Sequence, residues 1–332
     1  MKKGKISQSV LKRSVLRYIQ KENTETLKGA GIGEDCAFLA EKKGCQAVST
    51  QSFVLPAFDA AKYAVHAAVN NLAAGGARAH SITISLTLPT EWEESELQRL
   101  MRQTAETCKE LSVQIVGGHT EVTDSVAFPI ITVTALGQPF ADIKETEPDN
   151  KTGANLDIVM TKWIGLEGTV LLAKEKEEEL LARYPQSIVK TAQGFDTYLS
   201  LIPEAATAMM SDVYTMHDMR NGGVFGALYE LAKRMGVGLT IDLKQIPVKQ
   251  ETIEICEFFD LNPYELLSGG SLLIVTADGK KLVEELLEAG IFAAVIGKTT
   301  GSNDKVVLNE DETRFLEPAK ADEILKVNFA SA

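Results

Sequence analysis

The chain has 332 residues, of which 45% are apolar and 24% charged, and its formal net charge is −12. This balance is typical of a folded globular protein with room for two domains, and it excludes a disordered or fibrous chain. The negative charge argues against nucleic-acid or anionic-membrane partners, although backbone amides can still bind a phosphorylated ligand.

The start of the chain predicts a helix rather than a targeting segment. Its first five residues are basic, but no apolar block follows them. Apolar residues instead recur at helical spacing, at Val10, Leu11, Val15, Leu16 and Ile19. No run approaches the roughly 20 apolar residues of a membrane span. The four cysteines are scattered without a CxxC pair, which favours free thiols in a reducing cytoplasm.

Helical and strand patterns alternate along the chain, which indicates a mixed α/β architecture. In the first half we expect strands at 81–88 and 129–137 and helices at 58–74 and 91–111. The polar segment 139–153 is the predicted boundary between domains 1–150 and 151–332. In the second half we expect strands at 157–161, 213–216, 237–243, 272–276 and 292–297, and helices at 166–183, 186–201, 203–211, 223–235, 251–259 and 280–289.

The first candidate ligand segment pairs flexible glycines with two adjacent acids, in Gly31 to Asp35. A tight turn at Gly33 could bring the carboxylates of Glu34 and Asp35 to a metal or to ligand hydroxyls. A turn with two solvated acids is the alternative. In the helix 58–74, Asn71 shares a stripe with small alanines, so its amide needs a partner from a ligand or from a neighbouring loop.

The second candidate is Gly117-Gly118-His119-Thr120, between an apolar strand at 113–116 and the strand 129–137. Two glycines between strands allow close backbone approach to a ligand such as a phosphate. A carboxylate next would complete a Mg²⁺-nucleotide site, but His119 is a poor Mg²⁺ ligand. His119 could bind a softer metal together with nearby acids, or be a neutral, hydrogen-bonded histidine.

The third candidate, His217 to Gly223, lies between a strand and a helix. Free amides at a helix N-terminus attract anions, so Gly222 could contact a ligand and Asp218 would be an acid beside it. Asn221 could cap the helix. A purely structural cap is the alternative interpretation.

Together these segments resemble the superfamily of aminoimidazole ribonucleotide (AIR) synthase, thiamine-monophosphate kinase, selenophosphate synthetase and the hydrogenase-maturation factor HypE. The HypE branch is the most similar. Its glycine-acid-acid, Asn-Asp-Leu-Ala, Gly-Gly-Asp-Thr and Asp-x-Thr-Arg-Gly-Gly motifs correspond in order to Gly33–Asp35, Asn70–Ala73, Gly117–Thr120 and Asp218–Gly223.

The resemblance implies a fold and a binding site. It implies two domains of α+β type, each with an antiparallel or mixed sheet backed by helices. It also implies a homodimer formed through the N-terminal sheets, and ATP with Mg²⁺ between the domains. The cofactor-binding residues that it implies are Gly33, Glu34, Asp35, Gln51, Asn71, Gly117, Gly118, His119, Asp218, Asn221 and Gly222, with Glu34 and Asp35 as metal ligands. It identifies no catalytic residue.

The departures from the family pattern fall on the metal site. Gln51, Asn71 and His119 stand where the family has acids, and Asn221 where it usually has arginine. Three negative charges are thus missing, so we expect weak Mg²⁺ chemistry. HypE carries a carbamoyl group on a C-terminal cysteine, whereas this sequence ends Asn-Phe-Ala-Ser-Ala. We therefore do not expect the HypE reaction from this chain alone.

Three functions remain open. The first is a HypE-like, ATP-binding enzyme in hydrogenase or other cofactor maturation, with a partner protein. The second is a non-catalytic homodimeric module that binds a nucleotide or another small ligand. The third is a small-molecule kinase of the thiamine-monophosphate kinase type.

Overall fold

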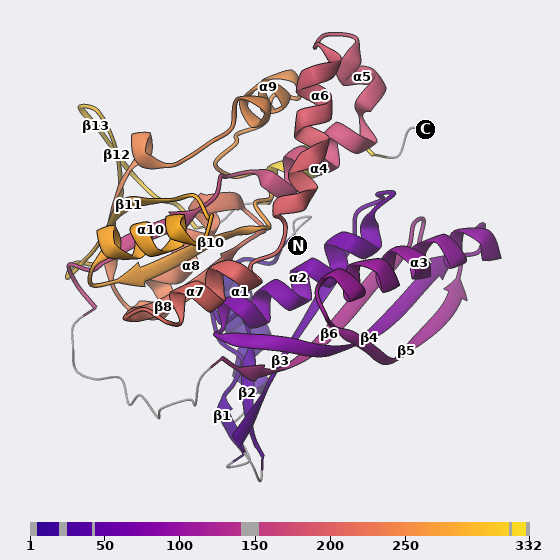
Figure 1. Cartoon of the computed structure of the whole chain (residues 1–332), viewed down its shortest axis with the longest axis horizontal. Coiled ribbons are helices and arrows are strands. Elements are labelled where there is room, and N and C mark those ends of the chain that lie inside the picture. Colours follow the sequence, from indigo (N-terminus) through magenta and orange to yellow (C-terminus); the bar gives the residue numbers. More distant parts are fainter. Residues whose placement is uncertain (1–4, 20–24, 42–43, 141–152, 319–320, 330–332) are drawn as a thin grey trace.

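The structure is a computed structural model that describes residues 5–19, 25–41, 44–140, 153–318 and 321–329. These residues form two mixed β-sheets, each with helices packed against it (Figure 1). The expected fold class is therefore confirmed. In the sequence, the predicted domain boundary falls between β6, the last strand of the first sheet, which ends at Pro139, and β7, which begins at Asp157; its residues 141–152 are outside the described ranges.

The first sheet has the strand order β1-β2-β3-β6-β4-β5, and all neighbours are antiparallel except β4 and β5. Helices α2 and α3 lie along one face of it (Figure 1). The strands are β1 (Thr26–Lys28), β2 (Ala37–Glu41), β3 (Gly44–Phe53), β4 (Ala77–Pro89), β5 (Gln114–Thr123) and β6 (Ile130–Pro139), and the helices are α2 (Ala60–Ala74) and α3 (Glu94–Glu110). The alternation in β4 buries Ile82, Ile84, Leu86 and Leu88, as its sequence pattern predicts.

The glycine pair at 117–118 does not lie between two strands. It is part of β5, which runs without interruption from Gln114 to Thr123. A Cβ at Gly118 would lie 2.0 Å from the carbonyl oxygen of Ile84 in β4. Gly118 therefore serves the close approach of two paired strands, and the expected ligand loop is wrong at this position.

The second sheet has the order β13-β12-β9-β11-β7-β10-β8, with β12 and β9 parallel. Its strands are β7 (Asp157–Thr161), β8 (Val213–Met219), β9 (Gly238–Asp242), β10 (Ser271–Thr276), β11 (Ala293–Thr300), β12 (Lys305–Asn309) and β13 (Glu312–Phe315). The helices of the second half are α4 (Leu166–Glu175), α5 (Glu177–Leu181), α6 (Gln186–Gln193), α7 (Ile202–Ala208), α8 (Gly223–Met235), α9 (Gln250–Phe258) and α10 (Gly279–Glu288). Helices α8 and α10 contact strands of this sheet, whereas α4, α6 and α9 contact one another.

Two helices expected in the second half are shorter than their sequence pattern suggests. The segment 166–183 divides at Lys176 into α4 and α5, and α6 ends before Gly194, where a 3₁₀ turn continues to Tyr198. The exposed hairpin β12–β13 was not expected, because its short strands carry polar residues and lack a buried alternating face. At the start of the chain, α1 (Gln8–Ser14) is present but buries none of its residues.

Helix α2 is buried on nearly every side, and it carries Asn71, one of the residues predicted to bind a ligand. It packs on the first sheet and also contacts β8 and α7 of the second half. The carboxamide of Asn70 donates to the carbonyl of Leu199 and accepts from the amide of Leu201. The prediction of a single buried face around Asn71 was therefore too narrow, because α2 lies between the two halves of the chain and is buried by both.

Two further observations concern the helices and the cysteines. No helix in the described ranges is long and apolar enough to cross a membrane. All four cysteines fall in described ranges and are free thiols, and burial raises the pKa of Cys36 and Cys256 to about 12. The thiols of Cys36 and Cys256 are therefore protonated and unreactive at neutral pH.

Candidate functional site

A polar cavity of about 300 Å³ lies where the glycine-acid segment, β3 and α2 meet β8 and α8. The N-terminal segment around α1 borders it as well. Seven of the residues expected to bind a ligand line this cavity: Gly33, Glu34, Asp35, Gln51, Asn71, Asp218 and Asn221. The structure thus brings together residues that are far apart in the sequence.

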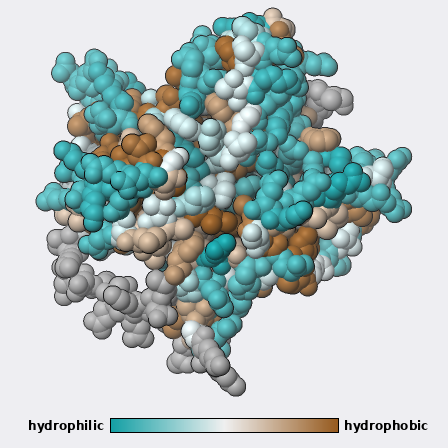
Figure 2. All heavy atoms as spheres, in the orientation of Figure 1, coloured by the Kyte–Doolittle hydropathy of each residue, from teal (hydrophilic) through white to brown (hydrophobic). Residues whose placement is uncertain are grey.

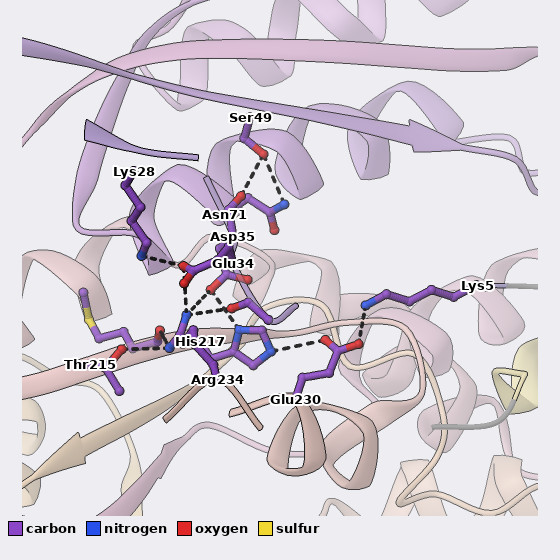
Figure 3. A network of polar contacts seen from close by, with 12 residues as sticks. Lys5, Lys28, Glu34, Asp35, Ser49, Asn71, Thr215, His217, Glu230 and Arg234 are labelled. Atoms are coloured by element: carbon purple, nitrogen blue, oxygen red, sulfur yellow. Dashed lines mark hydrogen bonds and ion pairs between the residues drawn. The ribbon is translucent and has the colours of Figure 1, made fainter. Parts of the chain in front are cut away.

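The centre of the cavity is an ion pair between the two halves of the chain. The Nδ1 atom of His217 in β8 lies 2.9 Å from Oδ2 of Asp35, and both side chains are buried (Figure 3). Ser49 donates to the carbonyl oxygen of Asp35 at 3.1 Å, and Asn71 donates to the Ser49 hydroxyl at 3.2 Å. Asn71 therefore has the partner that a buried amide needs, and it steadies the segment that carries Asp35.

His217 is held between two carboxylates. On its other side, Nε2 lies 3.4 Å from Oε2 of Glu230 in α8. Burial alone would lower the pKa of His217, but the charge of Asp35 and hydrogen bonding to Asp35 and Glu230 outweigh it and raise that pKa to about 9. His217 is thus an imidazolium at neutral pH. Sequence reasoning missed both His217 and Glu230 as site residues, although His217 immediately precedes Asp218.

The remaining charges of the cluster are matched by basic side chains of the chain itself. Lys28 lies 2.6 Å from Glu34, and Lys5 lies 2.7 Å from Glu230. Arg234 donates to the carbonyl of Gly33 at 2.7 Å and lies 3.6 Å from Asp35 (Figure 3). The acids Glu34, Asp35 and Glu230 are thereby neutralised by Lys28, Lys5, Arg234 and His217.

Among the described residues, Asp218 is the one buried acid of this cavity that faces no ion-pair partner. Among the described residues its Oδ1 has no hydrogen-bond partner. Burial, with a further contribution from the charge of Asp35, raises the pKa of Asp218 to about 7. The neighbouring Arg220 is already bound through two hydrogen bonds to the carboxylate of Glu167. Asp218 is therefore available to a ligand as a hydrogen-bond or proton acceptor.

The start of α8 differs from the expected anion site. Asn221 does not cap the helix, because the N-cap is Gly222, which has a φ of +82°. The Gly222 amide donates to Oδ2 of Asp322 at 2.6 Å. This amide is thus satisfied by an acid of the chain, and Gly222 borders a separate cavity. The expectation that Gly222 contacts the same ligand is not met.

Gly117, Gly118 and His119 are not brought to the polar cavity within one chain. They lie on β5, which is separated by β6 and β4 from the β3 strand that carries Gln51. Three inter-strand spacings amount to about 14 Å. The His119 side chain is 66% exposed and lies 3.1 Å from Glu121. The expectation that His119 shares one cleft with Asp35 is therefore wrong for a single chain.

The donor set does not fit a Mg²⁺ ion as it is arranged. In the described part of the chain, no three His, Cys, Asp or Glu side chains converge with the spacing of a metal site. Each carboxylate that could bind Mg²⁺ already faces a lysine, arginine or imidazolium, apart from Asp218. A divalent cation would have to displace these basic side chains, because they already neutralise the carboxylates that would bind it.

The polar cavity continues into a second lobe of about 350 Å³. The two share six lining residues, including Lys5, Arg220 and Asn221. The second lobe has an apolar wall formed by Phe53, Leu55, Leu267, Ile324 and Leu325. The first lobe is charged and the second adds an apolar wall to the charged residues they share, so the cleft suits a ligand with both a polar and a flat apolar part, as in a nucleotide.

Comparison with known proteins gives a consistent result. The family model for the N-terminal domain of AIR synthase related proteins matches residues 33–138, and the model for their C-terminal domain matches residues 154–309. A hydrogenase expression/formation protein of Methanocaldococcus jannaschii is 26% identical over 92% of this chain and 91% of its own length. The carbamoyl dehydratase HypE of Rhodobacter capsulatus is 26% identical over 82% of this chain and 77% of its own.

Solved structures share the fold. HypE in complex with ATP superimposes with a TM-score of 0.69 at 19% identity and covers 97% of both chains. A thiamine-monophosphate kinase bound to AMPPCP and TMP has a TM-score of 0.65 at 17% identity, covering 86% of this chain and 92% of the other.

Proposed function

This chain belongs to the family of AIR synthase related proteins, and on that premise we propose that it is a HypE-like nucleotide-binding protein that acts in hydrogenase maturation. Support comes from relatives over most of the chain that are a hydrogenase formation protein and carbamoyl dehydratases. The proposed nucleotide is ATP, since a HypE of the same fold binds it. The proposed location is the cytoplasm, in line with the four free thiols.

One observation supports a metal-independent form of this function. The acids of the polar cavity are neutralised by Lys5, Lys28, His217 and Arg234, so the cavity needs no metal to offset its own charge. Phosphates would approach a nearly neutral, donor-rich surface rather than an acidic one. We therefore propose that ATP binds without Mg²⁺ and that Mg²⁺-dependent hydrolysis is weak.

Titration calorimetry with ATP tests this proposal. We expect the dissociation constant in EDTA to match that in millimolar Mg²⁺ within about threefold, because no carboxylate pair is free to bind the ion. As a control, Lys28→Gln should weaken the metal-free affinity, since it removes the cation nearest to Glu34 and leaves only Arg234, at 3.9 Å, to offset that carboxylate. Binding that requires Mg²⁺ would contradict the proposal, and no binding in either buffer would remove ATP as the ligand.

A catalytic function has one specific observation in its favour, the unpartnered carboxylate of Asp218. A carboxylate with a pKa of about 7 can accept a proton from an acceptor nucleophile near neutral pH. If the chain turns over ATP with an acceptor, Asp218→Asn should abolish turnover while ATP still binds. Turnover that survives this change would assign the chemistry to another group.

Two partners belong to the proposal. A chain of a solved HypE–HypF complex shares the fold of this protein, with a TM-score of 0.70 at 24% identity. That complex supports a maturation protein as a partner. The second partner is another copy of this chain, bound through the first sheet. Its edge strand β5 leaves Val116 and Val122 58% and 61% exposed. Hydrophobic atoms also gather where Figure 1 places α3, β4 and β5 (Figure 2).

We expect a dimer in solution, held in part by this edge strand. Light scattering at micromolar concentration should give twice the mass of the chain. Val122→Asp should shift the population to monomers, because it places a charge on the apolar part of the edge. Leu287→Asp is the matched control, since Leu287 is equally exposed on α10. A monomeric natural protein would refute the dimer.

A further inference from the structure

A cavity outside the proposed nucleotide site lies between α8 and the β12–β13 hairpin. Its volume is about 370 Å³, within the range of small-ligand sites. It shares no lining residue with either lobe of the cleft described above. The nucleotide proposed for that cleft therefore does not account for it.

The wall of this cavity is aromatic. The rings of Phe225 and Tyr264 stack with their centroids 5.1 Å apart and their planes within 10°. Phe315 belongs to the β12–β13 hairpin, on the opposite side of the cavity, and is 67% exposed. The buried residues Val307 and Leu316 also line the cavity. Three aromatic rings around an open volume provide negative ring faces that attract a cation.

Backbone hydrogen bonds hold the Phe225–Tyr264 part of the aromatic wall in place. The amide of Tyr264 donates to the side chain of Asn262, whose own amide donates to Glu323. The amide of Phe225 donates to the carbonyl of Tyr264. Because these bonds fix the turn on α8, a ligand would not have to order it.

The charge of the lining points to the same class of ligand. The carboxylate of Glu265 makes no hydrogen bond or ion pair among the described residues, and it is only partly exposed. Arg314 also borders the cavity, but its guanidinium lies 2.6 Å from Glu312, which offsets its charge. The lining is thus aromatic, and its unpaired charge among the described residues is the carboxylate of Glu265.

We infer that this cavity is a second small-molecule site, which binds an organic cation with an apolar body, such as a substituted ammonium or a cationic heteroaromatic ring. The rings of Phe225, Tyr264 and Phe315 surround the apolar body, and Glu265 pairs with the positive charge. An aromatic anion is disfavoured, because it would meet the carboxylate of Glu265.

Titration calorimetry with benzyltrimethylammonium tests the site, in protein saturated with ATP so that the cleft is occupied. We expect one equivalent to bind, and at least about tenfold more tightly than benzyl alcohol or benzoate, which share the ring but lack the positive charge. The same titration without ATP should give the same affinity, because the two sites share no residue. Equal binding of the three probes, or no binding of the cation, would overturn the inference.

Substitutions locate the binding. Glu265→Gln and Phe315→Ala should each weaken the cation about fivefold or more, and Phe315 is exposed enough to be removed without disturbing the core. Glu310→Gln is the matched control, because Glu310 lies in the same hairpin, is paired with Lys244 and does not border the cavity. If Glu310→Gln weakens binding as much as Glu265→Gln, only diffuse negative charge is involved and the site is refuted. Loss of ATP binding with the cation site intact would contradict the proposed function alone.

Discussion

Raising the pH from about 6 to about 9.5 should lower the free energy of unfolding by about 3 kcal/mol through His217 alone. Burial lowers the pKa of this histidine, but Asp35 and Glu230 outweigh that effect and raise the pKa from 6.5 to about 9. A group whose folded pKa is raised stabilises the protein fully below its unfolded pKa, and that stabilisation is lost as the pH rises through the folded pKa. The loss therefore falls between pH 6.5 and about 9.

Neighbouring groups add to this dependence at lower pH. The pKa values of Asp218 and Asp322 are raised to about 7 and about 6, chiefly by burial, so their contribution is lost as the pH rises from 3.8 to these values. The pKa of Glu230 is lowered to about 2 although burial opposes the shift, because His217 and Lys5 face it. Its contribution is lost only as the pH falls from 4.5 towards 2, outside the window of His217.

Urea unfolding over this pH range measures the stability change, and proton NMR of the four histidines identifies its source. The His217 ring should titrate near pH 9, whereas that of His66, whose pKa is lowered to about 3 by burial and by Lys62, should stay neutral throughout. His217→Gln should remove the slope between pH 6.5 and 9. A natural protein in which every histidine titrates below pH 7 would show that the Asp35–His217 pair is not formed.

Restoring two acids should strengthen Mg²⁺ binding at least about tenfold, provided that they join Asp35 and Asp218 in one site. Gln51→Asp combined with Asn71→Asp adds two carboxylates to the lining of the polar cavity. The change at Asn71 keeps the shape of the side chain, but the Ser49 hydroxyl beside it must turn away from the carbonyl of Asp35 to donate to the new carboxylate. The two positions share one cavity, so their effects need not add.

His119→Asp is the internal control for this experiment. Within one chain His119 is exposed on β5, away from the cavity, so its replacement should leave Mg²⁺ affinity unchanged. Calorimetry with Mg²⁺, or electron paramagnetic resonance with Mn²⁺ in its place, measures the affinity. A folded double variant without any gain would show that Gln51 and Asn71 do not mark the metal position. A gain from His119→Asp alone would show that a second copy of the chain brings β5 to the cavity.

The sequence by itself determined the elements that depend on local periodicity. The alternation in 81–88 and the helical spacing in 223–235 reappear as β4 and α8, because side-chain direction repeats every two residues in a strand and every 3.6 in a helix. The family resemblance also selected Glu34, Asp35, Gln51 and Asn71, which all line one cavity. Glycine was the ambiguous signal: Gly118 is required by the backbone of β4 and not by a ligand.

Only the tertiary structure decided the charge of the site. Asp35 and His217 are 182 positions apart, and no local pattern links them. Their contact depends on how β8 and α8 pack against the first half around the buried helix α2. The same packing places Arg234 and Glu230 beside the acids, whereas strand order leaves His119 at the far edge of the first sheet. A pKa is set by burial and by charges within a few ångströms, so a site that the sequence marks as acidic becomes nearly neutral once the chain has folded.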